Sequence, residues 1–330
     1  MEHWTLENHP SIRELVRPLT PLIRDQKVTE ISINGFGEIW IERVGLGYAA
    51  ETAPWCTANW AWMFCLGLAN VSGHSFPTNR DDVRAKPILS LVLPGRHRLH
   101  AILGHTVPSG IALSIRLYRV DEKRTLADFG LAEGVATRLC RTIAAGATVL
   151  VSGAVGSGKS SLLRLLAREI PRHRRVVVIG DLDELELPHP NQIALMRSRF
   201  AQSVMAPDFG DLIDSVLRLN GSVTVLNELS YDNAVPAMRL LNTGALGGFL
   251  TTLHSNSPLD ALEAWRRNIA MREGSQGGAE IVAFLARTVD VVVHVTKTGV
   301  DRREVTGIAW KDPATGELDV PWRRVTAGAM

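Results

Sequence analysis

The chain is short of the features that mark secreted and membrane-spanning proteins. It has only three cysteines in 330 residues, Cys56, Cys65 and Cys140, without C-x-x-C spacing or an even count, which favours a reducing cytoplasm. Its most apolar run, 60–69, falls well short of the roughly 18 residues that cross a bilayer. We expect a buried helix there, with a membrane-surface role as the alternative. The polar, mixed-charge N-terminus lacks the pattern of a signal peptide.

The chain also lacks an excess of charge of either sign. Its formal net charge is +2, which argues against a surface that attracts nucleic acid as a whole, although basic runs such as 172–175 remain candidate contacts. Tryptophans can stack on bases, but the eight here are more typical of cores or subunit interfaces. His97, His100 and His105 point in different directions along a strand and have no cysteine partners. We therefore predict neither direct nucleic-acid binding nor a structural metal.

The first third of the sequence has the pattern of a small α+β domain. Apolar and polar residues alternate over 28–42 around Asn34-Gly35-Phe36-Gly37, which predicts a β-hairpin. Two further strand-like runs, 88–93 and 98–103, flank Pro94-Gly95, and 112–118 follows them. We predict an α+β N-terminal domain over residues 1–118 and a charged linker over 119–127.

From residue 128 to 330 the pattern changes to alternating helices and strands. A helix-like segment at 131–144 precedes strand-like runs at 148–152, 176–179, 223–226, 249–253 and 289–295. Strands separated by helices predict an α/β domain with a mainly parallel sheet covered on both faces. Ligands of such sheets bind at the carboxyl ends of the strands.

One eight-residue segment matches the phosphate-binding pattern G-x-x-x-x-G-K-[ST]. An apolar strand precedes it and a helix-like run begins at Ser161, and the segment itself consists of Gly153, Ala154, Val155, Gly156, Ser157, Gly158, Lys159 and Ser160. Backbone N–H groups of such a loop surround the phosphates of a nucleotide, the lysine pairs with them and the hydroxyl holds Mg²⁺. An ordinary glycine-rich turn does not require a Lys-Ser pair after its third glycine. The segment therefore predicts binding of ATP with Mg²⁺.

Polar residues follow three of the other predicted strands. They are the acidic stretch 181–184 after the second strand, Asn227 and Glu228 after the third, and His254 after the fourth. Carboxylates here can bind Mg²⁺ through water and orient the attacking water, and the histidine can sense the γ-phosphate or transfer a proton. Singly, each also fits a cap, a turn or a half-buried histidine. Together with the loop, they favour one shared site.

Four segments resemble the hexameric secretion ATPases of type II and type IV secretion, conjugation and Tad or type IV pili. They are the hairpin VTEISINGFGEIWIE, the segment LPGRHRLHAILGHTVPSGIALSIRLY, the acidic box LDELELPHPN and the histidine box NTGALGGFLTTLHSNSPLDAL. The hairpin and the histidine box are most similar to the conjugation and type IV secretion branch, with the Tad-pilus branch next. The resemblance implies a RecA-like P-loop ATPase domain in a homohexameric ring. It also implies a cytoplasmic location peripheral to the inner membrane, with apparatus proteins there as partners, and ATP-driven domain motion.

The resemblance also assigns roles by position. It implies that Glu228 is the catalytic acid and that His254 couples hydrolysis to domain motion. It implies that Arg98 and Arg116, from the N-terminal domain, contact the nucleotide. The remaining family positions are Lys159 and Ser160 for phosphate and Mg²⁺, and Asp181 and Glu184 for the acidic box.

Three positions depart from the family pattern, because Gly180, Asn220 and Ser230 stand where charged residues are usual. Each missing charge predicts turnover lower by on the order of 10²-fold, by analogy with deleted transition-state donors. We interpret the chain as an ATP-hydrolysing ring motor that energises secretion, conjugative transfer or pilus assembly. A nucleotide-binding but catalytically weak ring subunit, a P-loop nucleic-acid motor and a small-molecule kinase are the alternatives.

Overall fold

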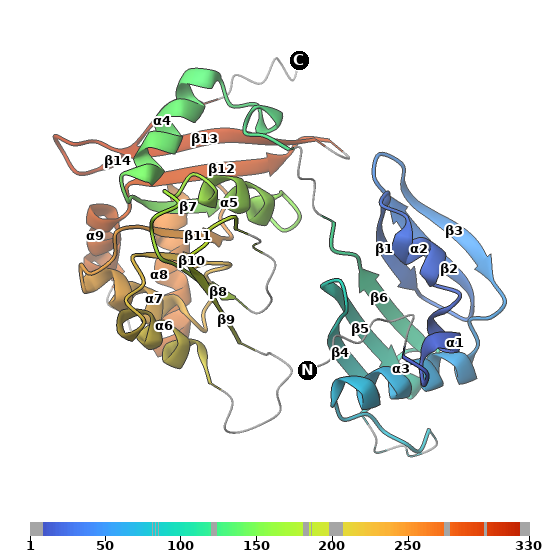
Figure 1. Ribbon diagram of the computed structural model, residues 1–330. Helices are drawn as coiled ribbons and strands as arrows, with labels where there is room; N and C mark the ends of the chain where they lie inside the picture. The colour runs from blue at the N-terminus through green and yellow to red at the C-terminus, as the bar shows by residue number, and fades with distance from the viewer. Residues whose placement is uncertain are drawn as a thin grey trace. The chain divides into compact units, whose positions relative to one another are not determined.

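The computed structural model describes residues 9–80, 82, 84, 86–119, 124–180, 185, 187–197, 207–273, 278–299 and 302–323 (Figure 1). The chain divides into two compact units between Glu122 and Lys123, each with a hydrophobic core of its own. Arg119, the first residue of the predicted linker, donates hydrogen bonds to the carbonyl oxygens of Val28, Ile23 and Asp25 in the N-terminal unit. Residues 120–123 lie outside the described part, so the predicted domain and linker limits stay predictions.

The N-terminal unit is a sheet with helices on one face, and its strands run in the order β3-β2-β1-β6-β5-β4. Each neighbouring pair is antiparallel. Its elements are α1 (Arg13–Val16), α2 (Thr20–Arg24), β1 (Val28–Ile33), β2 (Gly37–Arg43), β3 (Gly47–Ala53), α3 (Ala58–Ser72), β4 (Ile88–Leu93), β5 (His97–Leu103), η1 (Gly104–Thr106) and β6 (Ile111–Arg116).

Alternation of side chains explains how this sheet packs. Ile31 and Ile33 of β1 are fully buried in the core that α3 covers, whereas Ser32 between them lies on the other face and is only half-buried. The predicted hairpin is confirmed, with β1 and β2 paired antiparallel and Gly37 at φ +84° starting the second strand. Such a backbone angle suits glycine because it has no Cβ.

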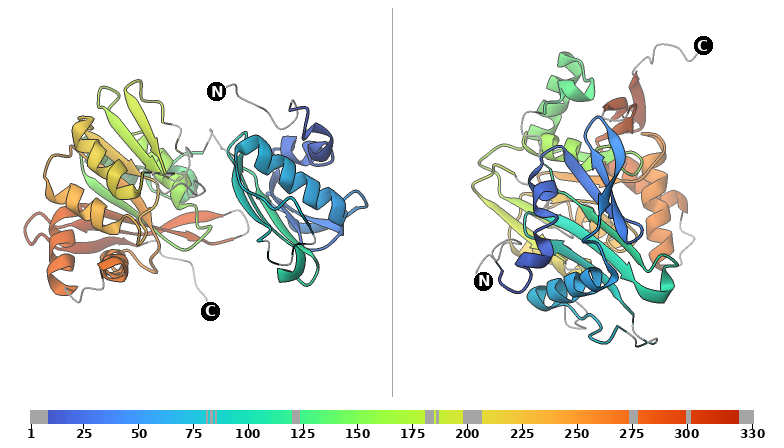
Figure 2. Two further views of the ribbon diagram at one scale, coloured as in Figure 1. Left: turned by 90° about the horizontal axis from the view of Figure 1, so that it is seen from below. Right: turned by 90° about the vertical axis from the view of Figure 1, so that its right-hand side faces the viewer.

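Helix α3 contains the apolar run that the sequence predicts to be a buried helix, and this prediction is confirmed (Figure 2). The Thr57 side chain caps its start by accepting a hydrogen bond from the Trp60 backbone N–H. The Trp60 indole donates to the Leu15 carbonyl oxygen at 2.9 Å and stacks on Phe64. None of the helices in the described part of the chain is both long and apolar enough to cross a membrane.

The histidines at 97 and 100 point to opposite faces of β5, as alternation predicts. His97 is buried and accepts a hydrogen bond from the Tyr118 backbone N–H at 3.0 Å, while His100 is exposed and contacts Ser90. Burial, with a smaller contribution from the charge of Arg119, lowers the pKa of His97 to about 4. Within the described residues no group of three histidine, cysteine or acidic side chains is arranged to hold a metal ion.

The C-terminal unit is built on an eight-stranded sheet in the order β14-β13-β12-β7-β11-β10-β8-β9. Pairs from β12 to β9 are parallel, and β13 and β14 are antiparallel additions at one edge. Its elements are η2 (Ala127–Phe129), α4 (Glu133–Ala144), β7 (Thr148–Ser152), α5 (Lys159–Ala167), β8 (Val176–Gly180), β9 (Gln192–Met196), α6 (Phe209–Arg218), β10 (Val223–Leu226), α7 (Ala234–Asn242), β11 (Phe249–Leu253), α8 (Asp260–Glu273), α9 (Gly278–Thr288), β12 (Val291–Lys297), β13 (Arg303–Lys311) and β14 (Leu318–Arg323).

Helices cover both faces of the parallel strands, which is the arrangement that the sequence predicts. Val149 and Val151 of β7 pack into a core shared with α4 and α5, whereas Leu150 between them belongs to a core shared with α6 to α9. Figure 1 shows α6, α7 and α8 together on one side of the sheet. Because strands β12 to β9 are parallel, their carboxyl ends meet along one edge of the sheet, where a ligand of such a sheet binds.

Candidate nucleotide site

The glycine-rich loop runs from the end of β7 to the start of α5 and packs closely against neighbouring backbone. A Cβ on Gly153, at φ +153°, would lie 2.2 Å from the Val295 carbonyl oxygen, so no larger residue fits without a shift of the backbone. Gly158, at φ +96°, is the N-cap of α5 and lies against Phe129 and Arg303. The strand, loop and helix predicted from the sequence are confirmed.

Lys159 is buried at the start of α5 and its ammonium group contacts two acceptors. The Nζ atom donates to the Ala154 carbonyl oxygen at 2.9 Å and lies 3.1 Å from Nδ1 of His254. Burial lowers the pKa of Lys159 to about 8, and the charge of Glu228 partly offsets this effect. A buried ammonium group beside a glycine-rich loop is suited to binding an anion.

His254 joins Lys159 to Glu228. Its Nε2 atom lies 2.9 Å from Oε1 of Glu228, on the side of the ring opposite to the Lys159 contact. Because an ammonium group can only donate, Nδ1 of His254 accepts and Nε2–H donates to the carboxylate. Three residues that the sequence predicts for one site, from α5 and from the ends of β10 and β11, thus form one chain of hydrogen bonds.

Asn233 holds the backbone of Glu228 in place, a role that no sequence pattern predicts. Its side chain is fully buried, donates to the Glu228 carbonyl oxygen at 2.9 Å and accepts from the Ser230 backbone N–H at 2.9 Å. This fixes the turn between β10 and α7, where Asn233 is the N-cap residue. An asparagine just before a helix is a recognisable cap signal, but nothing in the sequence indicates that its side chain hydrogen-bonds to the backbone of the preceding turn.

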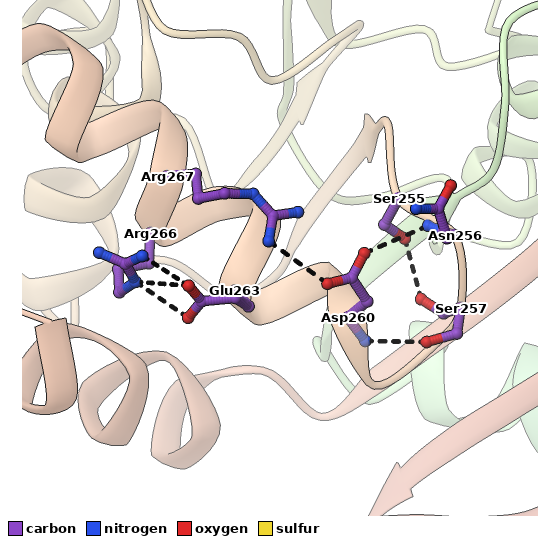
Figure 3. Close-up of polar contacts among 7 residues, drawn as sticks. All are labelled: Ser255, Asn256, Ser257, Asp260, Glu263, Arg266 and Arg267. Atoms are coloured by element: carbon purple, nitrogen blue, oxygen red, sulfur yellow. Dashed lines mark hydrogen bonds and ion pairs between the residues drawn. The ribbon is translucent and has the colours of Figure 1, made fainter.

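The segment after His254 is fixed by polar contacts at the start of α8 (Figure 3). The Asp260 backbone N–H donates to Ser257 Oγ at 3.1 Å, and the Asp260 carboxylate accepts from the Asn256 backbone N–H at 3.3 Å. Ser255 Oγ donates to the Ser257 carbonyl oxygen at 2.9 Å. These contacts hold the turn that follows His254 at the end of β11.

Buried polar atoms around the loop fit a bound polar group. Ser157 Oγ in the loop and Asn227 Oδ1 at the end of β10 are buried, and none of the described residues hydrogen-bonds to them. Such atoms normally have partners, so a ligand or water is expected to supply them. Below the loop, Ser152 Oγ and His294 Nδ1 lie 2.8 Å apart, and burial together with the charge of Lys159 lowers the pKa of His294. Both effects favour the neutral form of His294.

The remaining predicted site residues lie in several places. Ser160 is exposed in the first turn of α5, Ser161 is half-buried beside it, and Val155 projects into solvent. Asp181 and Glu184 lie outside the described residues. Arg98 and Arg116 lie in the N-terminal unit, exposed and directly opposite each other on β5 and β6. Their role at the nucleotide stays a prediction.

One of the three departures from the family pattern has a local structural account. Asn220 adopts a left-handed conformation with φ +53° just after α6, where asparagine is better tolerated than most residues. The Ser230 backbone N–H is bound by Asn233. Gly180 ends β8 and is buried, and its carbonyl oxygen accepts from the Arg197 backbone N–H at 2.9 Å.

Comparison with known proteins settles the family. A family model described as type II/IV secretion system protein matches residues 86–299. The chain belongs to this family. This chain is 27% identical to the type IV secretion system protein VirB11 of Brucella suis biovar 1 over 339 positions, and the match covers 92% of this chain and 91% of that protein. It is 24% identical to protein VirB11 of Agrobacterium tumefaciens, covering 87% and 90%.

Solved structures with the same fold include an ATPase and a pilus retraction motor. The Legionella pneumophila ATPase DotB matches with a TM-score of 0.64 and 16% identity, covering 96% of this chain and 84% of that one. The pilus retraction motor PilT with bound ADP matches with a TM-score of 0.59 and 17% identity, covering 96% and 85%. The RecA-like fold class predicted from the sequence is confirmed. Family membership also makes this chain a nucleotide-binding secretion ATPase.

Proposed function

We propose that this ATPase is a ring motor whose ATP hydrolysis energises type IV secretion or a related transfer process, with Lys159, His254 and Glu228 at its centre. The observation that carries the assignment of roles is the hydrogen-bonded chain from Lys159 through His254 to Glu228. It joins the cation that the loop pattern requires to a carboxylate that can act as a base.

The site residues divide the work of hydrolysis. Lys159 binds the β- and γ-phosphates, together with backbone N–H groups of residues 153–158. Glu228 orients and deprotonates the attacking water, and Asn233 keeps its backbone in position. When Lys159 exchanges its contact with His254 for one with phosphate, Nδ1 of His254 loses its hydrogen-bond donor. That exchange couples the state of the nucleotide to the end of β11.

Mg²⁺ fits this site through Ser160, whose hydroxyl is exposed in the first turn of α5. When bound, the ion neutralises charge on the transferred phosphoryl group. Asp181 and Glu184 are proposed to hold it through water, as the acidic box of the family implies. Arg98 and Arg116 are proposed to pair with phosphate charge in one state of the ring and to leave it in another, because a planar guanidinium forms two parallel hydrogen bonds with phosphate.

The assembly and its surroundings are also proposals. We propose a homohexamer, as the family resemblance implies. In that family, the nucleotide site also uses residues from a mobile N-terminal unit. The VirB11 relatives are named as type IV secretion system proteins, which supports a place at the cytoplasmic face of the inner membrane, in contact with proteins of a secretion apparatus. The substrate would then be a macromolecule, moved by domain motion in the ring.

Steady-state ATPase measurements on the assembled protein test the assigned roles. We expect Lys159→Ala to abolish ATP binding and Glu228→Gln to reduce turnover by on the order of 10²-fold or more while ATP still binds. Glu280→Gln, a substitution of an exposed carboxylate on α9, is the matched control and leaves turnover unchanged. Full turnover in both Lys159→Ala and Glu228→Gln would refute the assignment.

A catalytically weak ring subunit is the second candidate, because Gly180 offers no side chain where the family has a carboxylate. Clear ATP binding with no turnover at any protein concentration would favour it. Turnover stimulated by DNA, with steep salt dependence, would instead indicate a nucleic-acid motor.

A further inference from the structure

The β12–β13 pair packs against the phosphate-binding loop. The Val295 carbonyl oxygen of β12 approaches Gly153 so closely that a Cβ there would lie 2.2 Å away. His294 of β12 is directly opposite Ser152 of β7 and shares a hydrogen bond with it. The first residue of the loop is therefore fixed by packing against β12.

The middle of the loop is not fixed by packing. Gly156 has φ +72°, and a Cβ placed on it would meet no atom within 4 Å. Its carbonyl oxygen nevertheless has a side-chain donor, because Nε of Arg303 lies 3.3 Å from it. Arg303 is the first residue of β13, so this contact joins residues 147 positions apart in the sequence.

The stem of Arg303 lies over a second glycine of the loop. A Cβ on Gly158 would lie 2.7 Å from Cδ of Arg303 and 3.5 Å from the ring of Phe129. Arg303 therefore crosses the loop from Gly158 to Gly156. Its aliphatic part lies against Gly158, and its guanidinium group contacts the Gly156 carbonyl oxygen.

We propose that Arg303 is a positioning residue for nucleotide binding, and this inference rests on the proposed function. By donating to the Gly156 carbonyl oxygen, Arg303 holds that carbonyl away from the concave side of the loop, where backbone N–H groups bind phosphate. The loop thus stays close to its binding conformation without a nucleotide. Arg303 lowers the cost of ordering the loop when ATP binds.

Isothermal titration of the full-length protein with ATP and Mg²⁺, together with steady-state kinetics, tests this inference. Loss of a partly exposed hydrogen bond from a charged donor predicts a rise of about five- to tenfold in the Kd and KM for ATP in Arg303→Ala. We expect kcat to change by less than about twofold, because the contact acts on binding and not on the transition state. Arg303→Gln keeps a donor without the charge and is expected to lie between wild type and Arg303→Ala.

Arg302→Ala is the matched control, because Arg302 is the neighbouring arginine and pairs with Glu304 at 2.8 Å instead. It removes the same charge and is expected to bind ATP as wild type does. An equal loss of affinity in Arg302→Ala and Arg303→Ala would overturn the inference in favour of general charge attraction. The inference would also be overturned if the thermal unfolding midpoint of nucleotide-free Arg303→Ala fell far enough to account for the weaker ATP binding of this variant.

Lys159→Ala separates this inference from the proposed function. If Lys159→Ala abolishes ATP binding and Arg303→Ala binds as wild type does, only the role of Arg303 is refuted. If Lys159→Ala itself binds ATP normally, the proposed phosphate site fails and the role of Arg303 fails with it.

Discussion

Affinity for ATP is expected to fall steeply above pH 8 because of Lys159. In the nucleotide-free protein, burial lowers the pKa of this lysine to about 8. About nine tenths of the molecules therefore carry the ammonium group at pH 7, and about one tenth carry it at pH 9. Phosphate oxygens stabilise the charged form, so ATP binds to the protonated fraction. The Kd is then expected to rise about tenfold between pH 7 and pH 9.

Isothermal titration calorimetry measures this directly, in two buffers that differ in ionisation enthalpy. At pH 8 about half of the lysines take up a proton on binding, so about half a proton is expected per ATP bound. The second ionisation of a phosphate group has a pKa of about 6 and is essentially complete by pH 8, which leaves the interval from pH 8 to 9 to the protein. A Kd that is constant from pH 7 to 9, with no proton uptake, would refute this reasoning.

The lowered pKa of Lys159 has the opposite effect on the stability of the nucleotide-free protein, which is expected to rise with pH while the affinity for ATP falls. The pKa of this lysine is lower in the folded than in the unfolded state, so the unfolded state binds more protons between about pH 8 and 10.5. Stability therefore rises with pH across that interval, by at most about 3 kcal/mol for a difference of about 2.5 in pKa. ATP binding and nucleotide-free stability thus respond to pH with opposite signs.

Two further predictions concern Asn233 and His97. Asn233→Ala leaves the turn at Glu228 without two partly buried hydrogen bonds, so we expect kcat to fall at least tenfold while the Kd for ATP changes little. An unchanged kcat in steady-state assays would contradict this role. His97 has its pKa lowered to about 4, so stability is expected to fall by up to about 3 kcal/mol as the pH drops from 6.5 to 4. Urea unfolding measures it, and an identical pH dependence in His97→Gln would show that another group is responsible.

Local patterns predicted most of the fold. The β1–β2 hairpin, the strands β7, β10 and β11 and the helix after the phosphate loop appear where periodicity and the motif placed them. The edge strands β3 and β9 and the antiparallel pair β13 and β14 were missed. Edge strands are half-exposed and carry a weaker apolar pattern, as in the mixed burial of Gln192–Met196.

The part of the candidate site formed by residues near the ends of strands was predictable from the sequence. Lys159, Glu228 and His254 meet because parallel strands end at one edge of the sheet. Asn233 and Arg303 were not predictable, because their roles depend on one buried turn and on a contact between distant segments. Periodicity in sequence carries no information on either.

The rate of ATP cleavage in a single turnover, measured for Glu228→Gln protein already saturated with ATP, tests the central claim most directly. The proposed role of Glu228 predicts an ATP affinity within about twofold of wild type and cleavage slower by about 10²- to 10⁴-fold. Cleavage at the wild-type rate with ATP fully bound would contradict it.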